Sequence, residues 1–179
     1  MQYLRVATLV AIATVSLSIG PAFAEDAFEA DANAALKQLY DTTPAAKMIG
    51  EKAHAILVFP RIVKAGFIVG GQYGEGVLLI NGKLVAHYNS VAASYGLQAG
   101  VQAFGYALFL MNDKALSYLE KSDGWEIGVG PSIVIVDKGI AKTLTTTTLK
   151  DDVYAFIFDQ KGLMAGLGLQ GSKITKLEK

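Results

Sequence analysis

The residues best able to do chemistry in this sequence are four basic side chains that flank one apolar stretch. They are Lys47, Lys52, Arg61 and Lys64. Only one acid, Glu51, lies among them, so the segment carries a local charge of +3. Cations near an anionic surface attract phospholipid head groups, each contributing about 1 kcal/mol. If the helix expected over 44–53 and a turn over 60–64 lie at one end of the fold, the four cations form a lipid-binding patch. The alternative is that they are ordinary solvated side chains that flank a core strand and, through their charge, oppose its aggregation.

Other residue types give little basis for catalysis or metal binding. The chain has two histidines, His54 and His87, and no cysteine, which excludes disulfides, thiolate metal sites and a cysteine nucleophile. Segment 166–171 has G-x-G-x-x-G spacing, but its alternating leucines continue a strand pattern and no helix follows, which favours a bent strand over a phosphate-binding turn. We therefore predict no metal, no cofactor and no enzymatic activity. A site assembled from scattered Asp, Glu and Tyr residues stays open as an alternative.

Length and composition indicate one globular domain with a large apolar core. Of the 179 residues, 52% are hydrophobic and 18% charged, which is too apolar for a disordered protein. Lysine plus arginine and aspartate plus glutamate each number 16, so the formal net charge is zero. Because no overall positive charge attracts polyanions, we expect no nucleic-acid partner.

The segment 1–24 is typical of a secretory signal peptide. Arg5 precedes an apolar run from Val6 to Ile19, and small residues lead to an Ala-x-Ala cleavage site that ends at Ala24. The run is shorter than the roughly 20 residues that span a bilayer, so a transmembrane anchor fits less well. We predict cleavage near Ala24, a single domain over 25–179, and a periplasmic or secreted location peripheral to a membrane.

Hydrophobic periodicity predicts N-terminal helices followed by a series of strands. Apolar residues recur on one face of 25–41, and Thr43-Pro44 can begin a second helix over 44–53. Asn81-Gly82 predicts a hairpin turn, and Asn112 can cap a helix over 114–121. Pro60 is expected to end the first strand. Strands are predicted at 55–59, 66–74, 76–80, 83–88, 97–111, 127–137, 143–149, 153–158 and 163–174.

Glycines inside the apolar strand runs indicate a curved sheet, because a strand glycine marks a bulge or a close approach of backbones. We predict an α+β fold: a strongly bent antiparallel sheet or partly closed barrel, with N-terminal helices and one further helix packed on it. Apolar residues on both faces of 153–158 indicate that both faces are covered. The predicted core is one continuous cluster of Phe59, Phe67, Val69, Phe104, Ile135, Phe156 and Phe158.

Three segments resemble the SYLF domain. They are AILVFPRIVKAGFIVGGQYGEG at 55–76, GLQAGVQ within 95–110 and KGLMAGL within 153–174, and the similarity extends over roughly 35–177. SYLF domains occur in bacterial envelope proteins and in eukaryotic actin-patch and phosphoinositide-binding proteins, so the resemblance implies lipid binding with neither catalysis nor a cofactor. In eukaryotic members a basic N-terminal amphipathic segment is held largely responsible for phosphoinositide binding. That site does not carry over, because a signal peptide and an acidic helix occupy this position here.

Two functions follow as hypotheses. The first is a non-enzymatic periplasmic or secreted protein that engages anionic phospholipid head groups at a membrane surface through Lys47, Lys52, Arg61 and Lys64. The second is a structural envelope protein or assembly module whose exposed strand edges pair with a protein partner of the envelope. The run Thr145–Thr148 is predicted to be such an edge.

Overall fold

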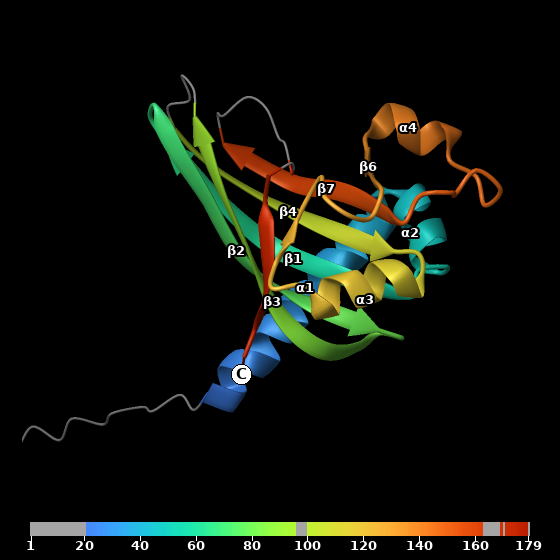
Figure 1. Cartoon of the computed structure of the whole chain (residues 1–179), viewed down its shortest axis with the longest axis horizontal. Helices are drawn as coiled ribbons and strands as arrows, with labels where there is room; N and C mark the ends of the chain where they lie inside the picture. The colour runs from blue at the N-terminus through green and yellow to red at the C-terminus, as the bar shows by residue number, and fades with distance from the viewer. Residues whose placement is uncertain (1–20, 96–99, 163–168, 170, 179) are drawn as a thin grey trace, which may run out of the picture.

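The computed structural model of the chain describes residues 21–95, 100–162, 169 and 171–178. The chain forms four helices and eight strands (Figure 1). The helices are α1 (Pro21–Thr42), α2 (Pro44–Gly50), α3 (Asp113–Lys121) and α4 (Lys138–Thr143). The strands are β1 (Ala55–Gly66), β2 (Val69–Ile80), β3 (Lys83–Tyr95), β4 (Gly100–Leu110), β5 (Trp125–Glu126), β6 (Ile133–Val136), β7 (Val153–Gly162) and β8 (Lys173–Leu177).

The eight strands form one sheet in the order β5-β8-β3-β2-β1-β4-β7-β6, which curls into a half-barrel (Figure 1). The predicted α+β fold with a strongly bent sheet is therefore confirmed. Neighbouring strands run antiparallel except β6 and β7, which pair in parallel. The parallel pair arises because the chain crosses through α4 between these two strands.

Local sequence signals explain where the helices and the first hairpin begin and end. Asn112 caps α3 by accepting a hydrogen bond from the backbone of Ala115 at 2.9 Å, as its residue type predicts. Asn81 and Gly82 both adopt positive φ angles, at 52° and 74°, which is the geometry of a tight turn between β2 and β3. Both predictions are confirmed.

Two apolar cores cover opposite faces of the sheet, where one continuous core was predicted. On the face that we call the α3 face, Phe59 and Phe104 pack with Leu119 of α3 and Trp125. On the opposite face, the α1/α2 face, Phe156 packs against helices α1 and α2, with Phe158 partly buried beside it. Successive side chains of a strand point to opposite faces of the sheet, so the residue next to one core position along a strand belongs to the other core.

A β-bulge at Pro60–Arg61 changes which face the later side chains of β1 occupy. The pairing of β1 shifts between Val58 and Val63 against β2, and between Phe59 and Ile62 against β4, so β1 holds one extra residue there. Proline lacks a backbone N–H, and a bulge is a place inside a sheet that tolerates that loss. The prediction that Pro60 ends the strand is therefore wrong, and β1 continues to Gly66.

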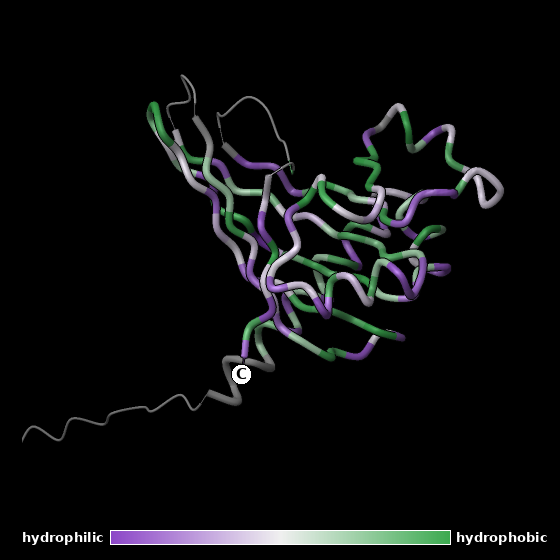
Figure 2. The backbone as a smooth tube through the Cα atoms, viewed as in Figure 1, coloured by the Kyte–Doolittle hydropathy of each residue, from purple (hydrophilic) through white to green (hydrophobic). Residues whose placement is uncertain are grey.

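Within the described ranges, only the half of the sheet nearest α2 is covered on both faces. We call the other end, which carries the turn between β1 and β2, the distal end (Figure 1). Phe67 lies in that turn and is 72% exposed, and Val69 is 60% exposed, so their predicted place in the core is wrong. Figure 2 shows this turn as an apolar tip that projects from the molecule.

Several strand predictions also differ from the structure. The strand predicted at 127–137 is limited to β6, because 127–131 is turn and bend. The strands predicted at 66–74 and 76–80 form one continuous β2, because Gly76 lies where a side chain would meet the ring of Phe59 rather than at a break. The run Thr145–Thr148 is a turn, closed by a hydrogen bond from the backbone N–H of Thr148 to the carbonyl of Thr145 at 3.0 Å. It is therefore not a sheet edge. Most of the strand predicted at 163–174 lies outside the described residues.

The two-core arrangement predicts that truncation to alanine lowers the free energy of unfolding much more at one phenylalanine than at another. Phe156→Ala removes a buried ring and should lower the free energy of unfolding by about 3 to 5 kcal/mol. Phe67→Ala removes an exposed ring and should change it by less than about 0.5 kcal/mol. Chemical denaturation followed by circular dichroism measures both values. Equal losses would show that the distal turn is packed into the core.

Candidate functional site

The four cations singled out in the sequence do not lie together. Lys47 is on α2 and Lys52 follows it, beside the start of β1, and both are exposed. Arg61 and Lys64 lie in the second half of β1. At about 3.3 Å per residue, Lys64 is roughly 30 Å along the strand from its first residue. The segment 60–64 is strand rather than turn, so the geometry assumed for a single basic patch is absent.

The distal end instead presents a surface of exposed apolar side chains, which we call the apolar tip. Its members are Phe67, Ile68 and Val69 in the turn and Val63, Tyr73, Val91 and Val101 on the adjoining strands. Val63 lies opposite Tyr73, and Tyr73 lies opposite Val91, so these three form a row across the α1/α2 face. Large exposed apolar patches mark sites that bind a protein or a membrane.

The α3 face of the same region carries buried polar side chains. Lys64 of β1 lies opposite Gln72 of β2 and Gln102 of β4 in the strand register, and we call these three residues the polar row. The three are only 8%, 6% and 4% exposed. Gln72 donates a hydrogen bond from Nε2 to the hydroxyl of buried Ser172 at 2.8 Å. In Gln102, the side-chain oxygen Oε1 is buried and has no hydrogen-bond partner among the described residues.

Buried hydroxyl groups continue this polar region toward the α3-side core. Ser90 and Tyr106 lie near each other, yet their hydroxyls and that of Tyr88 have no partner at hydrogen-bonding geometry among the described residues. Burial raises the pKa of Tyr106, and the nearby Ser90 hydroxyl lowers it by a smaller amount. Burial, with Glu120 as a second cause, raises the pKa of Tyr88 to about 12. These phenols therefore stay neutral and can both donate and accept hydrogen bonds.

The distal end thus reverses the usual polarity of a globular protein. Apolar side chains face outward on the α1/α2 face, and a lysine and two glutamines are largely covered on the α3 face. Such an arrangement costs stability in water, because buried polar groups lose hydration and exposed apolar groups order the surrounding water. It becomes favourable when an apolar phase contacts the tip or when a polar ligand contacts the row.

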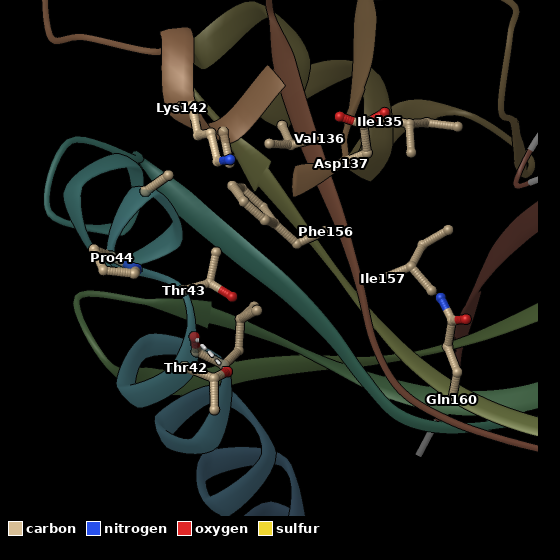
Figure 3. Close-up of a pocket in the computed structure, with 13 residues that line it drawn as sticks. Thr42, Thr43, Pro44, Ile135, Val136, Asp137, Lys142, Phe156, Ile157 and Gln160 are labelled. Carbon is tan, nitrogen blue, oxygen red and sulfur yellow. Dashed lines mark hydrogen bonds between the residues drawn. The ribbon is translucent and has the colours of Figure 1, made fainter. Parts of the chain in front are cut away.

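A second candidate is an apolar pocket of about 970 Å³ between the α1–α2 junction, α4 and β7 (Figure 3). Thr43, Val136 and Phe156 contribute to its wall, and its titratable residues are Asp137 and Lys142. Asp137 accepts hydrogen bonds from the backbones of Gly139 and Ile140, both at 2.8 Å, and so caps α4. A single carboxylate committed to a helix cap does not provide an acid–base pair.

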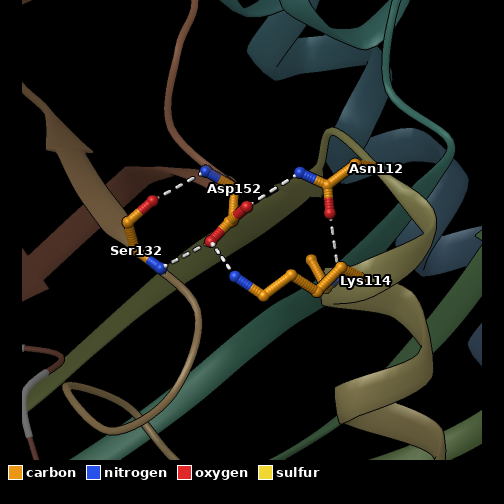
Figure 4. A network of polar contacts seen from close by, with 5 residues as sticks. Asn112, Lys114, Ser132 and Asp152 are labelled. Atoms are coloured by element: carbon orange, nitrogen blue, oxygen red, sulfur yellow. Dashed lines mark hydrogen bonds and ion pairs between the residues drawn. The ribbon is translucent and has the colours of Figure 1, made fainter.

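The most extensive polar network described has a structural role (Figure 4). Asp152, at the start of β7, accepts hydrogen bonds from Nδ2 of Asn112 at 2.9 Å and from the backbone of Ser132 at 3.0 Å. Lys114 lies 3.7 Å from the same carboxylate. The hydrogen bond from Asn112 is the main reason why the pKa of Asp152 lies below its ordinary value. The network joins the N-terminus of α3 to β6 and β7.

Metal ligands do not cluster within the described part of the chain. His54 contacts Asp113 at 2.7 Å, beside the start of α3, and His87 lies on β3 with its ring 6.2 Å from that of Phe28. Nor does any helix of the described ranges have the length and hydropathy to cross a membrane.

Sequence reasoning found Arg61 and Lys64 but missed the glutamines and the apolar tip. Gln72 and Gln102 lie 30 residues apart along the chain. Only the strand register places them on either side of Lys64. One signal for the tip was available: Phe67-Ile68-Val69 lies between Gly66 and Gly70, which is typical of a tight turn carrying apolar residues.

Comparison with known families gives one match. A family model described as Ysc84, Las17-binding protein actin regulator, matches residues 91–179. The matched residues include Gln102 and strands β4 to β8, whereas β1 and β2 precede them. No curated protein matches the chain.

The low pKa of Asp152 predicts how stability responds to pH. Its carboxylate is stabilised in the folded state, so the contribution is present above its ordinary pKa of 3.8 and is lost as pH falls through the lower folded-state value. Asp152→Asn should therefore lower the melting temperature at pH 7, and the difference from the unaltered protein should shrink below pH 3.8. Asp31→Asn, on the exposed side of α1, is the control. A difference that does not change with pH would contradict this role.

Proposed function

Because the chain belongs to the SYLF-domain family, which is linked to lipid binding and actin regulation, we propose that it binds anionic phospholipid membranes without catalysing a reaction. The contact is made by the distal end of the sheet. The observation that carries the proposal is the apolar tip, which leaves Phe67, Ile68 and Val69 exposed at the end of the β1–β2 hairpin.

The tip supplies most of the binding free energy. Transferring a large apolar side chain out of water is worth about 1.5 to 3 kcal/mol. Phe67 and Ile68 are 72% and 58% exposed in the free protein, so most of this gain is still available to them on entering a bilayer. Strand pairing of β1 with β2 extends to Gly66 and Gly70, directly beside the three residues, which limits the conformational entropy lost on binding.

One of the four sequence-predicted cations supports a preference for anionic lipid directly. Arg61 is exposed on β1 next to the tip, where it can contribute about 1 kcal/mol near anionic head groups, whereas Lys64 of the same strand is 8% exposed. Lys47 and Lys52 lie at the other end of β1 and do not reach the same surface. In this proposal they have no part in lipid binding.

The cellular setting remains part of the proposal. The signal-peptide pattern over 1–24 supports a periplasmic or secreted protein, peripheral to the membrane. Cleavage after Ala24 leaves α1 from Glu25 onward, and the buried residues of α1, from Ala32 to Leu39, are retained. Actin is not an expected partner in such a compartment.

The alternative, an assembly module that pairs through its strand edges, has weaker support. The two edge strands are short, because β5 spans Trp125–Glu126 and β6 spans Ile133–Val136. The Thr145–Thr148 run, which motivated that hypothesis, is a turn. A protein partner could still bind a surface other than a strand edge, and such binding would be compatible with lipid binding at the distal end.

Co-sedimentation with vesicles tests the proposal. The unaltered protein should bind vesicles that contain phosphatidylglycerol more strongly than vesicles of phosphatidylcholine alone, and added salt should weaken binding. The double variant Phe67→Ser/Ile68→Ser should bind at least about tenfold more weakly, because a tenfold loss corresponds to only about 1.4 kcal/mol. Arg61→Glu should weaken binding to the anionic vesicles alone.

Matched controls lie at the other end of the sheet. Val85→Ser changes a residue of β3 that is 50% exposed, and Lys47→Glu reverses an exposed charge on α2. Both should bind as the unaltered protein does. If the Phe67 and Ile68 changes leave binding intact, or if Val85→Ser weakens it equally, the distal end is not the membrane contact.

A further inference from the structure

The polar row contains a largely covered lysine whose charge the described structure does not neutralise. Lys64 is 8% exposed, and no carboxylate forms an ion pair with it among the residues that the structure describes. A methionine of similar length could fill the same place without a charge, so packing alone does not require a lysine at this position.

The register arranges two amide groups around this charge. Gln72 and Gln102 are the direct cross-strand neighbours of Lys64, on either side of it. Neighbouring strands lie about 4.8 Å apart, so the three side chains can converge on one small group above Lys64. Behind the row, the hydroxyls of Ser90 and Tyr106 are buried and lack partners within the described ranges.

Glycines continue the α3 face beyond the polar row. Gly66 pairs with Gly70 and with Gly100, which makes a cross-strand row of three glycines between Lys64 and the distal end. A side chain at Gly66 would meet the Cα of Gly70 at 2.5 Å, whereas a Cβ at Gly100 would have no neighbour within 4 Å. These three positions therefore add no side chains to the α3 face between the distal end and the polar row.

We propose that the polar row is a binding site for a phosphoryl group. Lys64 supplies the positive charge, and the amide N–H groups of Gln72 and Gln102 donate hydrogen bonds to the oxygens on either side. The tetrahedral phosphoryl group presents oxygens in several directions, which suits a central cation flanked by two donors. A carboxylate presents two oxygens in one plane and matches this arrangement less well.

Two molecules could carry this group, a soluble phosphate ester or the head group of a phospholipid. The lipid source rests on the proposed function, because the membrane would have to meet the distal end of the sheet. The soluble source does not depend on it. The site lies on the α3 face, whereas the row of Val63, Tyr73 and Val91 lies on the opposite face, so the two surfaces can be altered separately.

Thermal unfolding in the presence of phosphoryl probes tests the site. The probes are inorganic phosphate, glycerol 3-phosphate and phosphatidylglycerol vesicles, each compared with chloride or phosphatidylcholine at equal ionic strength. A ligand that binds the folded state raises the melting temperature as its concentration increases. We expect a rise for the unaltered protein and at least a fivefold loss of apparent affinity in Lys64→Met.

The same variant separates a binding role from a structural one. If Lys64 is retained for binding, Lys64→Met should keep the melting temperature without ligand, because a methionine of similar length fills the same space and breaks no ion pair of the described residues. Gln102→Leu should also weaken the response to the probes. The control Lys47→Met, at an exposed position on α2, should respond as the unaltered protein does.

The outcomes distinguish the ligand source and the failure of either proposal. A response to soluble probes that survives Phe67→Ser/Ile68→Ser supports the phosphoryl site even if membrane binding is lost. A response to anionic vesicles alone that Lys64→Met abolishes assigns the site to a lipid head group. No response of the unaltered protein to any probe overturns the proposal. An unchanged response in Lys64→Met, with a lowered melting temperature, overturns it as well and makes Lys64 a structural residue.

Discussion

The extra residue in β1 at Pro60–Arg61 determines the surfaces on which this account rests. Before the bulge, Leu57 and Phe59 point to the α3 face, and after it Ile62 points there. Strand side chains alternate, so Lys64 follows Ile62 onto the same face. Without the extra residue Lys64 would lie on the α1/α2 face and Val63 would be directed inward. The bulge thus buries a lysine and exposes a valine at the distal end.

The consequences of that placement depend on how far the helices extend. Helices α1 and α2 cover the α1/α2 face along the half of the sheet that contains Val58 and Val77. Beyond them, Val63, Tyr73 and Val91 are exposed in a row. Folding stability is supplied by the covered half, through aromatic packing such as the Phe59–Tyr106 stack at 4.5 Å and the Phe109–Phe156 contact at 5.4 Å. The distal end is therefore free to present surfaces that water does not favour.

Local signals in the sequence were sufficient for helices α1, α2 and α3, the first hairpin and the fold class, whereas α4 was not predicted. Ala32, Leu36 and Leu39 are buried on one stripe of α1, as their spacing predicts, because an amphipathic helix needs only one covered face. Pro60 was misleading because proline can mark either the end of a strand or a bulge within it, and the sequence alone does not distinguish the two. Phe67 was misleading because hydrophobicity predicts burial and does not indicate which apolar residues a turn will carry beyond the core. The partners of Lys64 depend on strand register, which a single sequence does not specify.

The most direct test of the central claim, that the distal end is the surface that enters a lipid bilayer, uses single-site spin labelling. The chain has no cysteine, so each of the single variants Ile68→Cys and Val85→Cys carries one nitroxide, attached at the new cysteine. With phosphatidylglycerol vesicles, the label at 68 should become more accessible to oxygen, which concentrates in lipid, and less accessible to a water-soluble nickel complex. The label at 85 should keep its accessibility to water. A label at 68 that stays in water while the protein is bound to vesicles, or a label at 85 that enters lipid instead, would contradict the account.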